Sequence, residues 1–159
     1  MNLANLTLIV LVVLSLSFPV ASSAPLRPTN YQYKLQHTKK DVECLAKNIY
    51  YEARGESQKG KIAVAQVTLN RVIHPSEFNK TICGVVYQKD QFSWTSTRKN
   101  YIKDKYHWEE AEHIARGILQ GKLFLENFDA LYFHTNYTKP TWRHTKQYIT
   151  TIGKHIFYL

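Results

Sequence analysis

Three stretches of this 159-residue chain repeat apolar residues at the spacing of an α-helix, and this pattern limits the possible folds more than any other feature. In the first stretch, about 39–54, apolar residues recur at the i, i+3, i+4 and i+7 positions of one helical face. They are Val42, Leu45, Ala46, Ile49 and Ala53. The same spacing predicts helices over about 62–72 and about 106–120. We therefore expect a core built mainly from helices.

The residues at the ends of these stretches predict where the helices start and stop. Thr38 or Asp41 can cap the first helix. Gly55 and Gly121 are natural left-handed stops for the first and third helices. A polar turn over 56–60 precedes the second helix, and Pro75 closes it.

The remaining segments predict a small amount of sheet. We expect one helical turn over 82–87 and an extended segment or loop over 91–94. The segments 130–134 and 155–158 are rich in β-forming residues and predict short strands. The expected fold is a single domain that is mainly α with a small β-sheet, an α+β architecture.

The N-terminal segment has the features of a secretory signal. Leu6–Val20 is apolar and uncharged, and small residues follow at 21–24. We expect residues 1–24 to be a signal peptide, or a signal anchor if they are not cleaved, followed by a linker over 25–38 and a folded domain over 39–159. A buried core helix is the alternative for the apolar segment. The protein is thus expected to be exported, and to meet a membrane only through an uncleaved N-terminal segment.

The cysteines and histidines indicate whether the chain has a disulfide or a metal site. In an oxidising compartment Cys44 and Cys83 predict one disulfide, with two buried free thiols as the alternative. They lie too far apart for a zinc knuckle and the seven histidines are scattered, so we expect no metal and no cofactor.

The net charge suggests the kind of partner. Lys plus Arg is 21 against 12 for Asp plus Glu, a formal charge of +9 that suits an anionic partner. Nucleic acid is an alternative partner, but export argues against it.

Glu52 is the side chain that best suits catalysis. The sequence has no Gly-rich phosphate loop, no Gly-x-Ser-x-Gly elbow and no His-Glu-x-x-His pair. Glu52 follows Ile49 by three residues, at the border of the apolar face, where desolvation raises the pKa of a carboxyl. Such a carboxyl can act as the general acid that breaks an acetal. The alternative is that Glu52 and Glu56 are surface residues that pair with Arg54.

Several blocks of sequence, in order, resemble the SleB-type cell wall hydrolases, the spore-cortex-lytic enzyme family. The first contains Tyr-Tyr-Glu-Ala-Arg-Gly-Glu, and together the blocks reach from near Asp41 to the C-terminal residues. They occupy 44–56, 60–72, 83–88, 91–94, 130–134 and 152–158.

This resemblance implies a lysozyme-like or lytic-transglycosylase-like catalytic domain over 39–159 that cuts peptidoglycan glycan strands. The catalytic glutamate of the family corresponds to Glu52, and a lytic transglycosylase needs only this one carboxyl. If a second carboxylate takes part, Glu56 and then Asp129 are the candidates, and the reaction becomes hydrolysis. We expect the enzyme to be a monomer.

The resemblance also suggests residues that bind the glycan. Aromatic rings stack on sugar faces, and polar side chains bind hydroxyl and acetamido groups. The candidates are Gln91, Ser93, Trp94, Tyr132, His134 and Trp142. For Trp94 and Tyr132 core packing is an equal alternative. We expect core packing for Phe92, Phe133 and Phe157, and we expect His155 to order the last strand.

Other activities stay open from the sequence. A hydrolytic muramidase or glucosaminidase and an N-acetylmuramoyl-L-alanine amidase act on the same polymer. A cysteine peptidase or amidase would pair Cys44 with His134 or His144, which a disulfide at Cys44 excludes. A wall-binding protein without catalytic activity is the last alternative.

Overall fold

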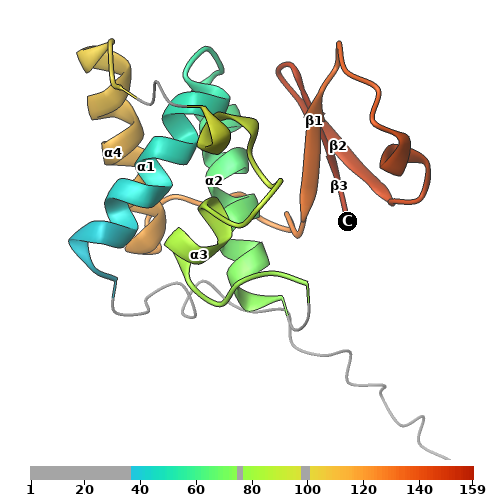
Figure 1. Ribbon diagram of the computed structural model, residues 1–159, viewed down its shortest axis with the longest axis horizontal. Helices are drawn as coiled ribbons and strands as arrows, with labels where there is room; N and C mark the ends of the chain where they lie inside the picture. The colour runs from blue at the N-terminus through green and yellow to red at the C-terminus, as the bar shows by residue number, and fades with distance from the viewer. Residues whose placement is uncertain (1–36, 75–76, 98–100) are drawn as a thin grey trace, which may run out of the picture.

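The computed structural model describes residues 37–74, 77–97 and 101–159. The predicted signal segment, most of the predicted linker and Pro75 lie outside these ranges. The elements are α1 (Lys39–Ala53), α2 (Gln58–Ile73), α3 (Ile82–Val86), η2 (Ser93–Ser96), α4 (Lys105–Leu119), β1 (Tyr132–Thr135), η3 (Thr141–His144), β2 (Tyr148–Ile152) and β3 (His155–Tyr158). The helices form one side of the molecule and the sheet the other (Figure 1). The expected α+β fold is confirmed.

Helix α1 begins where the sequence predicts. The Thr38 hydroxyl accepts the Asp41 N–H at 3.1 Å, and the Asp41 carboxylate accepts the Thr38 N–H at 2.9 Å, so both predicted caps act together. The prediction of a left-handed Gly55 is wrong, because the positive-φ glycines in the described ranges are Gly121 and Gly153. The backbone needs no left-handed residue at Gly55, because Ser57, the N-cap of α2, follows two residues later.

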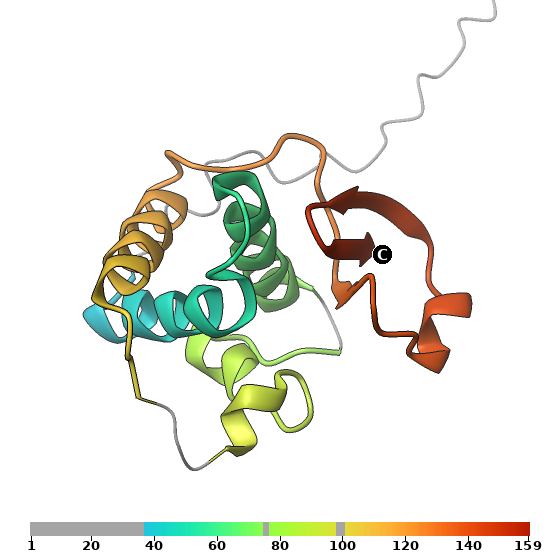
Figure 2. The same cartoon turned by 90° about the horizontal axis from the view of Figure 1, so that it is seen from above.

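Helix α2 starts four residues earlier than predicted. The Ser57 hydroxyl caps it by accepting the Gly60 N–H at 3.3 Å, so most of the predicted polar turn is its first helical turn. From Gly60 to Arg71 the helix is buried on all sides, because α2 lies between the other helices and the sheet (Figure 2). This central position explains why its sequence is apolar and β-branched rather than strongly amphipathic.

The sheet contains one strand that the sequence analysis missed. The order is β1-β3-β2 with antiparallel neighbours, and the predicted strands correspond to β1 and β3. The missed strand, β2, is rich in threonine and partly exposed, so it lacks a continuous apolar face. The segment predicted as extended near residues 91–94 instead enters the 3-10 turn η2, Ser93–Ser96.

The two largest apolar clusters join the helices to one another and to the sheet. Between α1, α2 and α4 the fully or almost fully buried residues include Leu45, Ile49 and Ile114. Between α2 and the sheet the cluster includes Val64, Val67, Phe128, Ile152 and Phe157. Burial of this apolar area is the main favourable term in the stability of the domain.

A disulfide joins α1 to α3. Cys44 and Cys83 are bonded across a Cα–Cα distance of 5.3 Å, so the predicted pairing is confirmed. In the part of the chain that is described, no helix is both long and apolar enough to cross a membrane.

Candidate active site

The Glu52 carboxyl lies in the last turn of α1 and is half-buried, beside the buried Ala53. Burial raises the pKa of Glu52 to about 7, and the positive charge of Arg71 only partly opposes this rise. No residue in the ranges 37–74, 77–97 and 101–159 donates a hydrogen bond to this carboxyl, so little offsets its lost hydration. The predicted rise of the pKa is confirmed. Near neutral pH such a group can both give and accept a proton.

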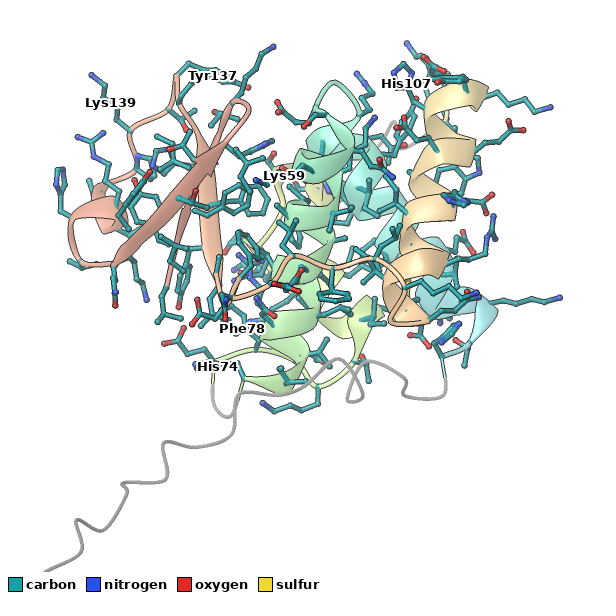
Figure 3. All side chains as sticks on the ribbon, turned by 180° about the vertical axis from the view of Figure 1, so that it is seen from behind. Lys59, His74, Phe78, His107, Tyr137 and Lys139 are labelled. Carbon is teal, nitrogen blue, oxygen red and sulfur yellow. A yellow bond between two sulfur atoms is a disulfide. The ribbon has the colours of Figure 1, made fainter. Side chains whose placement is uncertain are left out.

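Arg71, which was not predicted from the sequence, is the residue whose positive charge lowers the pKa of Glu52. It is 4% exposed, and its Nε donates to the Leu131 carbonyl at 2.7 Å. Its guanidinium lies 5.1 Å from the ring of Phe78 and 5.2 Å from the ring of Phe92. Figure 3 shows Phe78 near the end of α2, between this helix and the sheet. Burial lowers the pKa of Arg71 to about 10, so it keeps its charge at neutral pH.

Trp94 packs next to the helix that carries Glu52. Its indole stacks on Tyr51 with 4.6 Å between ring centroids, and its Nε1–H donates to Asn48 Oδ1 at 3.3 Å. The Asn48 amide in turn donates to Thr68 at 3.0 Å. Trp94 is 8% exposed, so most of its contacts are with the protein. Two other predicted glycan-binding residues lie close to Trp94 in the sequence: Gln91 is half-buried and Ser93 is exposed.

Three other predicted glycan-binding residues come together on the sheet side. The ring of Trp142 lies 5.8 Å from that of Tyr132 and 5.6 Å from that of His134. Nδ1 of His134 lies 2.8 Å from the Thr135 carbonyl oxygen, which only accepts, so Nδ1 carries the proton. Nε2 lies within hydrogen-bond distance of the Tyr158 hydroxyl, at 3.0 Å. Contacts at both ring nitrogens therefore fix the orientation of the His134 imidazole.

The two candidate second carboxylates have different surroundings. Glu56 is not the surface residue of the alternative interpretation, because its side chain is only 8% exposed and faces the sheet. Arg54 does not pair with it, since the guanidinium lies over the Tyr50 ring at 5.2 Å. Asp129 is half-buried just before β1. Over the described ranges no group of three or more His, Cys, Asp or Glu side chains could hold a metal ion.

The core predictions for the other residues are confirmed. Phe92 and Phe157 are 4% and 0% exposed, and Phe133 packs on the cluster between α2 and the sheet. His155 is buried in the last strand. Since Cys44 is in a disulfide, it has no free thiol, and the cysteine peptidase alternative is wrong.

A hollow of about 590 Å³ lies between the start of α1 and α4, lined by residues such as Val42, Trp108 and Arg116. Glu52 is at the opposite end of α1 and does not line it. The half-buried Glu52 and the buried Arg71 therefore lie outside this hollow.

A helical domain with a small antiparallel sheet, and a half-buried carboxyl of raised pKa in the last turn of α1, fits the class of lysozyme-like folds. The family model described as Cell Wall Hydrolase matches residues 55–158, so the chain belongs to this family. The match starts three residues after Glu52.

Curated relatives support the same assignment. The spore cortex-lytic enzyme of Bacillus cereus is 32% identical over 122 residues, which are 76% of this chain and 45% of the relative. That of Oceanobacillus iheyensis is 32% identical over 124 residues, 76% of this chain and 42% of the relative. The chain thus spans less than half the length of these relatives.

Solved structures show the same fold. The catalytic domain of the germination-specific lytic transglycosylase SleB from Bacillus anthracis matches with a TM-score of 0.67 and 29% identity, over 79% of this chain and 98% of that one. The Bacillus cereus SleB catalytic domain matches with a TM-score of 0.66 and 29% identity, over 79% of this chain and 94% of that one. The resemblance to the SleB-type family and the lysozyme-like fold are confirmed.

Proposed function

We propose that this domain cleaves peptidoglycan glycan strands between N-acetylmuramic acid and N-acetylglucosamine, as a lytic transglycosylase with Glu52 as general acid and base. The raised pKa of the half-buried Glu52 carboxyl, about 7, is the observation that carries this proposal. The similarity to a protein described as a lytic transglycosylase supports the reaction type.

In this mechanism Glu52 acts twice. The protonated carboxyl first donates its proton to the glycosidic oxygen, and the bond to the muramyl anomeric carbon breaks as an oxocarbenium-like centre forms. The Glu52 carboxylate then accepts the proton of the 6-hydroxyl of the same muramyl residue. That oxygen attacks the anomeric carbon and closes a 1,6-anhydro ring, and Glu52 is protonated again.

Arg71 supports the step in which Glu52 carries a negative charge. A carboxylate formed where water is scarce is costly unless a positive charge lies nearby. The buried Arg71 is held in place by the Leu131 carbonyl before the reaction starts, so little reorganisation is needed.

A single carboxyl suffices for this reaction, whereas two-carboxylate glycosidases place a second one ~5–9.5 Å from the first. The Glu56 carboxylate accepts the Lys154 N–H and lies close to His155, and these contacts favour a role other than catalysis. Asp129 remains the candidate for a second carboxylate, and reducing ends in the test below would favour that role.

The glycan-binding assignments are part of the same proposal. The group of Tyr132, His134 and Trp142 offers ring faces and a polar rim on the sheet side. On the helical side the proposed residues are Gln91, Ser93 and Trp94. We further propose that the protein is exported through residues 1–24 and acts as a monomer in the periplasm or cell wall.

Mass spectrometry of digested peptidoglycan tests the proposal. Anhydromuramyl products from the wild type, and none from Glu52→Gln, are the expected result. Reducing ends would indicate a muramidase or glucosaminidase, and freed peptides an amidase. Binding without any cleavage would leave only a wall-binding protein. Glu109→Gln, an exposed carboxylate on α4, is the matched control and should retain activity.

A further inference from the structure

The loop between α1 and α2 contains a carboxylate that the proposed reaction does not use, that of Glu56. Its backbone N–H donates to the Ala53 carbonyl at 2.9 Å, which holds it close to the end of α1. Its side chain is only 8% exposed, although nothing in the local sequence pattern predicts burial. A carboxylate removed from water needs partners, and these partners indicate its role.

Both carboxylate oxygens of Glu56 face the turn between β2 and β3. Oε2 accepts the Lys154 backbone N–H at 3.2 Å. Oε1 lies 4.0 Å from Nδ1 of His155, and within the described part of the chain this buried Nδ1 has no hydrogen-bond partner. Figure 1 shows the α1–α2 loop and the β2–β3 turn at the same end of the molecule. Glu56 therefore connects the helices to the tip of the hairpin.

Two glycines make room for the Glu56 side chain. Gly153 has φ +58°, and a Cβ at this position would lie 1.8 Å from Glu56 Oε2. A Cβ at Gly60, in the first turn of α2, would lie 2.9 Å from Glu56 Cβ. Any other residue at Gly153 would both strain the backbone and displace the carboxylate. The sequence thus provides space for this contact on two separate elements.

The contact acts on the strands that carry the proposed glycan-binding residues. After the turn, β3 pairs with β1, so that Tyr158 lies opposite Tyr132 and Ile156 lies opposite His134. Just before β1 the chain is held by the Arg71 hydrogen bond to the Leu131 carbonyl. Glu56 provides a second attachment, at the tip of the hairpin.

We infer that Glu56 is a positioning residue, which holds the Gly153–Lys154 turn against the end of the helix that carries Glu52. It thereby sets where β1 and its glycan-binding side chains lie relative to the catalytic carboxyl. This inference rests on the proposed function, and it assigns Glu56 to substrate placement rather than to the chemistry.

Kinetics on purified peptidoglycan test this role. Glu56→Ala should raise the half-saturating substrate concentration about tenfold, with kcat changed less than about threefold and the pH midpoint of kcat unchanged. Glu56→Gln keeps an oxygen that accepts the Lys154 N–H and should recover most of this loss. A loss of kcat in Glu56→Gln as large as that in Glu52→Gln would overturn the inference, because Glu56 would then be catalytic. A lower Tm with unchanged kinetics would also overturn it.

A double-mutant cycle tests the contact itself without substrate. Gly153→Ala should lower Tm, and adding Glu56→Ala should raise Tm above that of Gly153→Ala, because the overlapping carboxylate is gone. Additive Tm changes in a protein that cleaves peptidoglycan would overturn the positioning role alone. A wild-type protein that cleaves no peptidoglycan would overturn the proposed function and this inference with it.

Discussion

Replacing Glu52 by Gln should remove activity and also stabilise the folded domain at neutral and alkaline pH. The folded state holds the proton of Glu52 with a pKa of about 7, against 4.5 for an unperturbed carboxyl. Because the folded pKa is the higher one, the wild type loses stability as pH rises from 4.5 to about 7, and the loss is complete above that range. Gln has the same shape but no charge to desolvate, so it escapes this loss.

The size of the effect follows from the shift. At 1.36 kcal/mol per pKa unit, the move from 4.5 to about 7 corresponds to about 3 kcal/mol. The free energy of unfolding of Glu52→Gln should therefore exceed that of the wild type by about 3 kcal/mol at pH ~8.5 and by almost nothing at pH ~4.

Urea unfolding followed by circular dichroism at several pH values measures this difference. The exposed Glu109→Gln on α4 is the control, and its difference from the wild type should stay within about 0.5 kcal/mol at every pH. A gain for Glu52→Gln that does not depend on pH, or a wild type that is the more stable at alkaline pH, would refute the reasoning.

Three further predictions follow from other contacts. Arg71→Met removes the charge that lowers the pKa of Glu52, so the pH midpoint of activity should rise above that of the wild type; an unchanged midpoint in a folded variant would contradict this. Gly121→Ala should destabilise the domain by about 1 kcal/mol in urea, because Gly121 has φ +69°, whereas Gly55→Ala, with open space around it, should not. Reducing the disulfide, whose cysteines are 39 residues apart, should lower the free energy of unfolding by about 4 kcal/mol. A Tm that is the same with and without reductant would contradict this prediction.

Features that depend on neighbouring residues could be predicted from the sequence. The helical face of α1, the caps at Thr38 and Asp41 and the left-handed Gly121 all involve residues within one helical turn of each other. The position of Glu52 at the border of an apolar face follows from the same periodicity, and so does its raised pKa.

The tertiary structure alone decided what the distant residues do. Helix α2 became the central helix and β2 joined the sheet through contacts that no local pattern reveals. Arg71 acquired its place through a carbonyl 60 positions away, and Glu56 through an N–H 98 positions away. A pattern of neighbours says which side chains are apolar and which are charged. The partners of a buried charge come from whatever the folded chain brings next to it, and they decide whether that charge is catalytic or structural.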